Sequence, residues 1–122
     1  MTGSDRAWLR QTLTRVASPS PEDTLSQAEQ ARASRLVCAL VAERYPGRDV
    51  ELRVPPFAAV QLGSGERGAH TRGTPPNVVE TDAVTLLRLA SGVLAWPDAT
   101  GAHLVRASGT RSDLARLWPL RD

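Results

Sequence analysis

The residues best suited to acid–base or ion-binding chemistry lie on either side of the pair Pro75-Pro76. His70 and Arg72 precede this pair, and Glu80 and Asp82 follow it. An imidazole titrates near neutral pH, so a histidine beside carboxylates can move protons, and a neighbouring guanidinium can bind an anion. These four residues are therefore a candidate acid–base or anion-binding site. The simpler alternative is an ion pair at a strand edge, with Asp82 as a helix N-cap.

Two further side chains stand out against their surroundings. Arg88 interrupts an apolar segment, and it either extends to solvent or pairs with Glu80 or an anionic head group. Cys38 adjoins an apolar helix face, which favours a small buried side chain over a nucleophile. His70 and His103 are the only histidines of the sequence, too few for a histidine-rich zinc site. We expect no metal and no cofactor.

A glycine-rich turn follows the strand expected over 57–62. It reads Gly63-Ser64-Gly65-Glu66-Arg67-Gly68. It has neither the GxGxxG spacing nor the Gly-Lys-Ser/Thr ending of phosphate-binding loops. The turn is therefore predicted to be a hairpin connection to a strand over 69–73.

Composition narrows the class of protein. The 122 residues are 41% apolar and 23% charged, as in an ordinary globular domain, and no apolar run approaches the ~20 residues of a membrane span. The N-terminal residues lack the apolar core of a secretory signal, so a cytoplasmic protein is expected. The net charge is +2, and all 15 basic residues are arginines spread along the sequence. With only five aromatic residues, this distribution argues against nucleic-acid binding.

Hydrophobic spacing and turn residues predict the elements that position these side chains. Strands are expected over 49–54, 57–62, 69–73, 77–81 and 103–108, and helices over 5–16, 21–44 and 83–91, with a helical turn at 96–99 and a last short helix. Ser20, Asp82 and Ser112 are the expected N-caps. The helix over 83–91 is apolar nearly all round, which predicts burial on more than one side or a cavity wall.

This order of elements predicts an α+β fold. One long helix, four strands, a helix and a last strand indicate a mostly antiparallel sheet with helices on one face. The 122 residues are expected to form one domain. Its N-terminal helices occupy 1–47, and its sheet and remaining helices occupy 48–122.

Two long motifs resemble a small actinobacterial family related to sterol carrier protein type 2. They are Arg53 to Gln61 (RVPPFAAVQ) and His70 to Asp82 (HTRGTPPNVVETD), and the tail around Val105 to Leu114 (VRASGTRSDL) is similar too. The resemblance covers about 50–122. It implies a five-stranded sheet, helices against it, and an apolar tunnel for a lipid-like ligand.

The resemblance also suggests which residues would line such a tunnel. The candidate wall residues are Phe57, Ala59, Val60, Leu86, Leu89, Leu94 and Trp96, each of which could equally be plain core. The polar candidates for its mouth are His70, Arg72, Glu80 and Arg88. Three positions depart from the family pattern. Ala83 stands where proline often follows Asp82, and Leu86 stands where tryptophan is common, which leaves a wider or less closed slot. The glycine before the last strand is replaced by His103 or has moved to Gly101.

Three functional classes follow from these observations. The first is a non-catalytic carrier of a lipid-like small molecule, held by about 0.8 kcal/mol per buried methylene. The second is an accessory module with a filled core that binds a protein partner, because a distantly similar fold occurs in mycothiol-dependent isomerases. An enzyme is the least favoured, since the metal and thiol chemistry of those isomerases belongs to a separate domain with three histidines.

Overall fold

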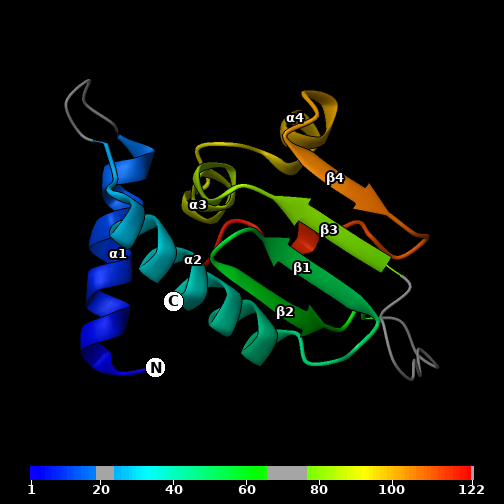
Figure 1. Cartoon of the computed structure of the whole chain (residues 1–122), viewed down its shortest axis with the longest axis horizontal. Coiled ribbons are helices and arrows are strands. Elements are labelled where there is room, and N and C mark those ends of the chain that lie inside the picture. Colours follow the sequence, from blue (N-terminus) through cyan, green and yellow to red (C-terminus); the bar gives the residue numbers. More distant parts are fainter. Residues whose placement is uncertain (19–23, 66–76, 122) are drawn as a thin grey trace.

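The computed structural model describes residues 1–18, 24–65 and 77–121 (Figure 1). The elements follow in the order α1 (Gly3–Ala17), α2 (Gln27–Arg44), β1 (Val50–Val54), β2 (Ala58–Leu62), β3 (Asn77–Thr81), α3 (Ala83–Ser91), α4 (Trp96–Gly101), β4 (Val105–Ser108) and the 3-10 helix η1 (Ala115–Leu117). The predicted α+β class is confirmed, and most predicted elements lie within a few residues of the observed ones.

The four strands of the described residues form one mixed sheet in the order β2-β1-β3-β4. β1 and β2 pair antiparallel, as do β3 and β4, but the central strands β1 and β3 are parallel. The prediction of a mostly antiparallel, five-stranded sheet is therefore wrong. Leu62 and Asn77 flank Val50 on opposite sides, so β3 takes the free edge of β1 instead of pairing beside β2. The strand predicted over 69–73 lies outside the described residues.

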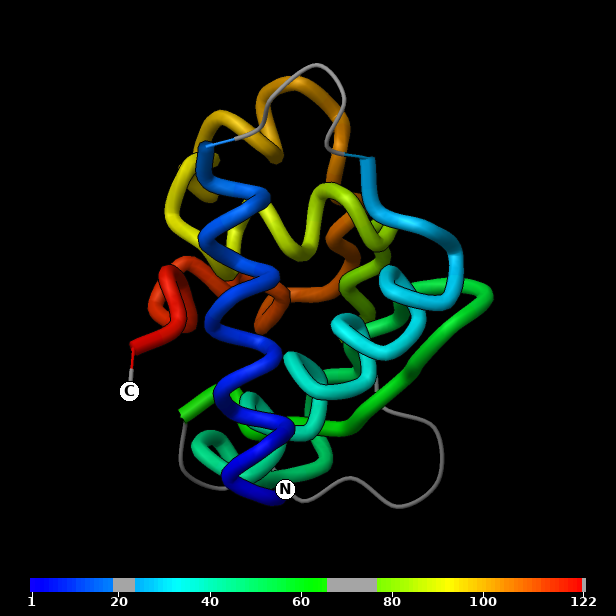
Figure 2. The backbone as a smooth tube through the Cα atoms, turned by 90° about the vertical axis from the view of Figure 1, so that its left-hand side faces the viewer, coloured from blue at the N-terminus to red at the C-terminus, as the bar shows by residue number. Residues whose placement is uncertain are grey.

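One face of the sheet is buried beneath helices. Val50, Leu52 and Val54 of β1 are at most 1% exposed, whereas Glu51 and Arg53 between them are partly exposed on the opposite face. α2 packs on β2 and on α3, and α1 packs on α3 and α2 from outside (Figures 1 and 2). The half-buried strand predicted from this alternation is confirmed.

α1 and α2 begin with the same N-terminal capping motif. Thr2 and Asp5 form a capping box at the start of α1, and Ser26 and Glu29 form one at the start of α2. The prediction that α2 starts near residue 21 is therefore wrong. Ser20, the expected cap, lies outside the described residues. The N–H groups that open a helix need partners outside its own backbone ladder, and the reciprocal box supplies them for Ser26 and Glu29.

Each capping carboxylate also binds an arginine of the other helix. Asp5 lies 3.3 Å from Arg32 of α2, and Glu29 lies 2.8 Å from Arg15 of α1. The hydrogen bond from the capping backbone, with help from the arginine, lowers the pKa of each carboxyl. The two helix starts are thus tied to the pairing of the helices with each other.

α3 has the bounds that its sequence predicts. Asp82 caps it by accepting a hydrogen bond from the backbone N–H of Thr85 at 2.8 Å, and Gly92 ends it with a positive φ of 87°. Six of its nine residues are buried. Burial on more than one side is confirmed, because α1 and α2 both pack against it.

A buried polar cluster joins the strands at one end of the sheet. The side chain of Asn77 donates to the carbonyl of Asp49 at 2.8 Å and accepts from the backbone N–H of Arg111 at 3.0 Å. The Asp49 carboxylate accepts from the N–H of Ser64 at 2.9 Å. Gly109 is needed here, since a Cβ would lie 2.2 Å from the Asn77 Oδ1. The cluster therefore connects the starts of β1 and β3 to the segments after β2 and β4.

Asn77→Ala is expected to lower the free energy of unfolding by about 2–4 kcal/mol, because it leaves a buried carbonyl and a partly buried N–H without partners. Urea denaturation measures this. Gln61→Ala, at an exposed position of β2, is the matched control and should cost under about 0.5 kcal/mol. Equal losses for the two variants would contradict this role for Asn77.

The turn after α4 explains one departure from the family pattern. His103 adopts a positive φ of 59°, the left-handed conformation in which glycine is preferred. Its N–H bonds the Thr100 carbonyl at 3.1 Å, and the N–H of Leu104 bonds the Ala99 carbonyl at 2.9 Å. These two bonds make a Schellman motif. The left-handed position is therefore that of His103 itself and not that of Gly101.

His103→Gly is expected to raise the free energy of unfolding by about 0.5–1 kcal/mol, because relief of the left-handed strain exceeds the added freedom of the unfolded chain. Thermal and urea denaturation report the change. Gly101→Ala, in the preceding helix with open space around it, serves as the comparison. A less stable His103→Gly protein would show that the imidazole itself holds this turn.

The last predicted helix differs from the observed one. Ser112 does not cap it, because its hydroxyl donates to the Gly109 carbonyl at 2.8 Å. Asp113 instead accepts from the N–H of Ala115, and only the short η1 follows. Ser112 therefore stabilises the turn after β4 instead of capping the last helix.

Candidate functional site

The predicted wall residues do not share one surface. Leu86, Leu89 and Trp96 are buried in the core, and Phe57, Val60 and Leu94 are partly buried against it. Ala59 is exposed, because it lies beside Arg53 on the opposite face of the sheet. The first six residues therefore belong to or adjoin the packed interior between helices and sheet. Ala59 does not.

The predicted polar cluster is divided by the sheet. Glu80 lies on the uncovered face, where its carboxylate is 3.9 Å from Arg106, while Arg88 is exposed on α3. A pairing of Arg88 with Glu80 is therefore not formed. His70 and Arg72 lie outside the described residues.

The uncovered face of the sheet carries alternating charges. Arg53 pairs with Glu51 on its own strand and lies in register with Glu80 on β3, which in turn faces Arg106 on β4. The hydrogen bond that Arg53 donates to the Glu51 carboxylate raises the pKa of Arg53. Each of these charges has an opposite neighbour. Exposed pairs of this kind contribute ~0–1 kcal/mol each.

A shallow depression of about 290 Å³ at this face brings together some of the acid–base candidates. Two of the four candidates, Glu80 and Asp82, lie along it, together with His103 and Arg106. Both carboxylate oxygens of Asp82 already accept hydrogen bonds from Thr85, at 2.8 and 3.0 Å. Asp82 is therefore committed to capping α3, as the simpler sequence interpretation proposed.

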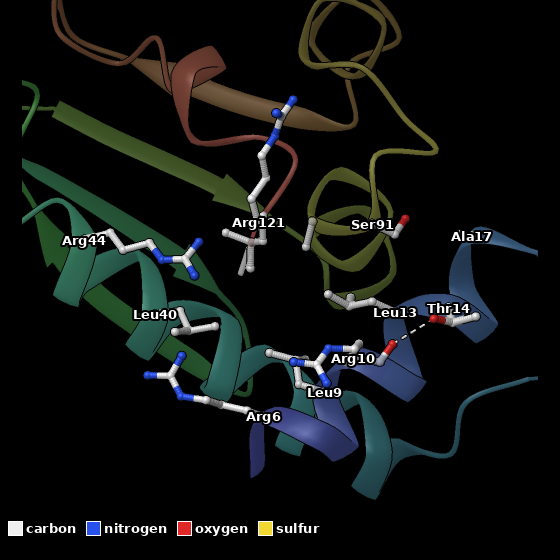
Figure 3. A pocket seen from close by; sticks show the side chains of 12 residues that line it. Arg6, Leu9, Arg10, Leu13, Thr14, Ala17, Leu40, Arg44, Ser91 and Arg121 are labelled. Carbon is white, nitrogen blue, oxygen red and sulfur yellow. Dashed lines mark hydrogen bonds between the residues drawn. The ribbon is translucent and has the colours of Figure 1, made fainter. Parts of the chain in front are cut away.

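A second pocket lies on the other side of the molecule, between α1, α2, α3 and the C-terminal tail (Figure 3). Its volume is about 220 Å³. Aliphatic side chains from all four segments form its apolar surface: Leu9, Leu13, Ala17, Leu40, Ala90 and Leu120. The tail is held there by a hydrogen bond from the N–H of Leu120 to the carbonyl of Ala90, at 3.0 Å.

The polar residues of this pocket are mostly arginines. Arg6 and Arg10 come from α1, Arg44 from the last position of α2 and Arg121 from the tail. In Figure 3 the side chains of Arg6 and Arg44 lie on either side of Leu40, and Arg44 extends from α2 over the pocket. Thr14 and Ser91 complete the polar lining, and no carboxylate side chain contributes to it from the described part of the chain. The arrangement can hold a hydrocarbon chain with an anion at its edge.

Sequence reasoning missed this pocket. None of the predicted wall or mouth residues in the described ranges lines it. Arg6 and Arg10 carry a local signal, since residues four apart lie on one helix face and Leu9 and Leu13 have the same spacing. Nothing local connects them to Arg44 or Arg121, which only the packing of helices and tail brings near.

Cys38 is a buried side chain, as the simpler interpretation expected. It is 1% exposed in the core, and burial raises the pKa of its thiol to about 12. The thiolate that a nucleophile requires is therefore strongly disfavoured in the folded protein.

Burial of Cys38 makes the fold sensitive to alkaline pH. In the unfolded chain the thiol ionises near its ordinary pKa of ~8.5, whereas the folded protein keeps it neutral up to about 12. The free energy of unfolding should therefore fall as pH rises between these values, by up to about 1.4 kcal/mol per unit. Denaturation curves from pH 7 to 11 test this, with Cys38→Ala as the control. Equal slopes for both proteins would contradict it.

Two negative findings apply to the described ranges 1–18, 24–65 and 77–121. No helix there is both long and apolar enough to cross a membrane. Within the same ranges, no three histidine, cysteine or acidic side chains are grouped so that they could hold a metal ion.

Comparison with known families gives a match over most of the chain. The pattern of a family described as bacterial SCP ortholog, where SCP stands for sterol carrier protein, fits residues 26–120. The match starts at the N-cap of α2 and includes every later element, whereas α1 lies outside it. A search of curated proteins finds no match.

Proposed function

Because the chain belongs to the family of bacterial sterol carrier protein orthologues, we propose that it is a non-catalytic binding protein for a lipid-like apolar molecule. The family match confirms the resemblance predicted from the sequence motifs. The observation that most directly supports binding is the aliphatic pocket between α1, α2, α3 and the tail.

The size of the pocket favours a slender ligand. Its volume of about 220 Å³ lies below the ~300–1,000 Å³ of typical small-molecule sites. A single hydrocarbon chain suits this space better than a bulky ring system. Each methylene that leaves water contributes about 0.8 kcal/mol, so even a short chain has a substantial driving force.

The interior between α3 and the sheet is a less accessible place for the same ligand. The predicted wall residues Leu86 and Leu89 are at most 1% exposed, and Trp96 is 9% exposed. A ligand between them must first separate these side chains from their core neighbours, which costs the packing they now have. Occupation of the pocket beside α1 carries no such cost.

Binding of a protein partner is the second candidate function. It is favoured by the face of the sheet on which Glu51, Arg53, Glu80 and Arg106 lie. The helices α1, α2 and α3 pack on the other side, so no helix of the described ranges covers this face. Its paired charges suit an interface with polar complementarity more than a lipid.

Titration with a fluorescent fatty acid tests the carrier proposal, together with native mass spectrometry of the purified protein. We expect saturable binding at one site. Ala17→Trp places a large ring in the pocket and should weaken binding at least tenfold by occupying the ligand's space. Val84→Trp adds the same ring at a 49% exposed position of α3 and should leave affinity unchanged.

Two results would overturn the proposal. One is no saturable binding by either method, which would favour the partner-binding module. The other is equal loss of affinity in both tryptophan variants, which would place the ligand elsewhere. Circular dichroism of each variant establishes that it is folded.

A further inference from the structure

We propose that the ligand of the pocket carries an anionic head group, a carboxylate or a phosphate monoester, and that Arg6 and Arg44 bind it. This inference deepens the proposed function and rests on it, because the pocket must first accept an apolar chain. It also assigns a binding role to α1, the helix outside the family match.

The distribution of charge is the first observation that carries the proposal. The whole chain has a net charge of only +2, with 15 basic and 13 acidic residues. Four of those basic residues line this one pocket, and no acidic residue of the described ranges does. The positive charge is therefore concentrated where the apolar surface is, which is the pattern expected of a site for an amphiphilic anion.

The pairing of the arginines is the second observation. Five arginines elsewhere in the fold have carboxylate partners: Arg15, Arg32, Arg53, Arg106 and Arg111. Within the described part of the chain, the structure gives the guanidinium groups of Arg6 and Arg44 no such partner. The acidic residue next to Arg6 is already engaged, since Asp5 bonds Thr2 and Arg32.

The geometry around Leu40 is the third observation. Leu40 is 6% exposed and forms part of the apolar surface, and the side chains of Arg6 and Arg44 lie on its two sides (Figure 3). A guanidinium donates two parallel N–H bonds to a carboxylate or phosphate. A chain lying against Leu40 would thus bring its head group between donors from two different helices.

Four ten-carbon probes of matched chain length test the inference: decanoate, monodecyl phosphate, decanol and decyltrimethylammonium. Titration calorimetry below the micelle concentration gives each affinity. We expect decanoate and monodecyl phosphate to bind about tenfold or more tightly than decanol, with the cation weakest. Added salt should weaken the two anions and leave decanol unaffected, because it screens only the charged contacts. The stronger of the two anions identifies the preferred head group.

Matched variants locate the head group. Arg6→Gln with Arg44→Gln should reduce the affinity for decanoate about tenfold and leave the affinity for decanol unchanged, since each exposed ion pair is worth up to about fivefold. Arg106→Gln, on the face of the sheet away from the pocket, is the control for the loss of one positive charge. Arg106→Gln combined with Arg53→Gln removes two positive charges, as the double pocket variant does. These control variants should leave both affinities unchanged.

The outcomes separate the two proposals. If none of the four probes binds, the carrier function itself fails. If decanol binds as tightly as decanoate, or the control variants weaken decanoate as much as the double variant does, the pocket binds a chain without recognising an anion. The head-group inference is then wrong and the carrier function stands.

Discussion

The side chain of Asn77 is the contact on which the arrangement of the sheet depends. It holds the carbonyl of Asp49 and the N–H of Arg111, so it joins the start of β1, the start of β3 and the chain after β4. A parallel pair of strands has no tight turn to set its register. The amide of Asn77 supplies that register at the first residue of β3. The close approach of Gly109 to the same amide fixes where β4 ends.

The sheet in turn determines how the helices must pack. β1 turns three fully buried residues toward α2 and α3, and α3 has too much apolar surface to be covered from one side. α1 supplies the second cover, although only Leu9 and Thr12 of its 15 residues are buried. Its contact with α2 and α3 is therefore incomplete, and the pocket is the space that this incomplete packing leaves.

The pairing of arginines with carboxylates differs between the two sides of the molecule. On the uncovered face of the sheet, arginines and glutamates alternate across the strands and neutralise one another. At the start of α1 and α2, Asp5 and Glu29 pair with Arg32 and Arg15 and hold the two helices together. Among the described residues, Arg6 and Arg44 have no carboxylate partner and no acidic side chain beside them in the pocket lining, so their charge is available to a ligand.

The sequence by itself determined the features that depend on near neighbours in the chain. The alternation in β1, the capping of α3 by Asp82 and its end at Gly92 are local, and so is the burial of Cys38 on an apolar helix face. Tertiary structure decided the rest. Strand order depended on a contact between residues 49 and 77, which no local pattern encodes. The pocket was equally hidden, because Arg6, Arg44 and Arg121 meet only when α1, α2 and the tail pack together.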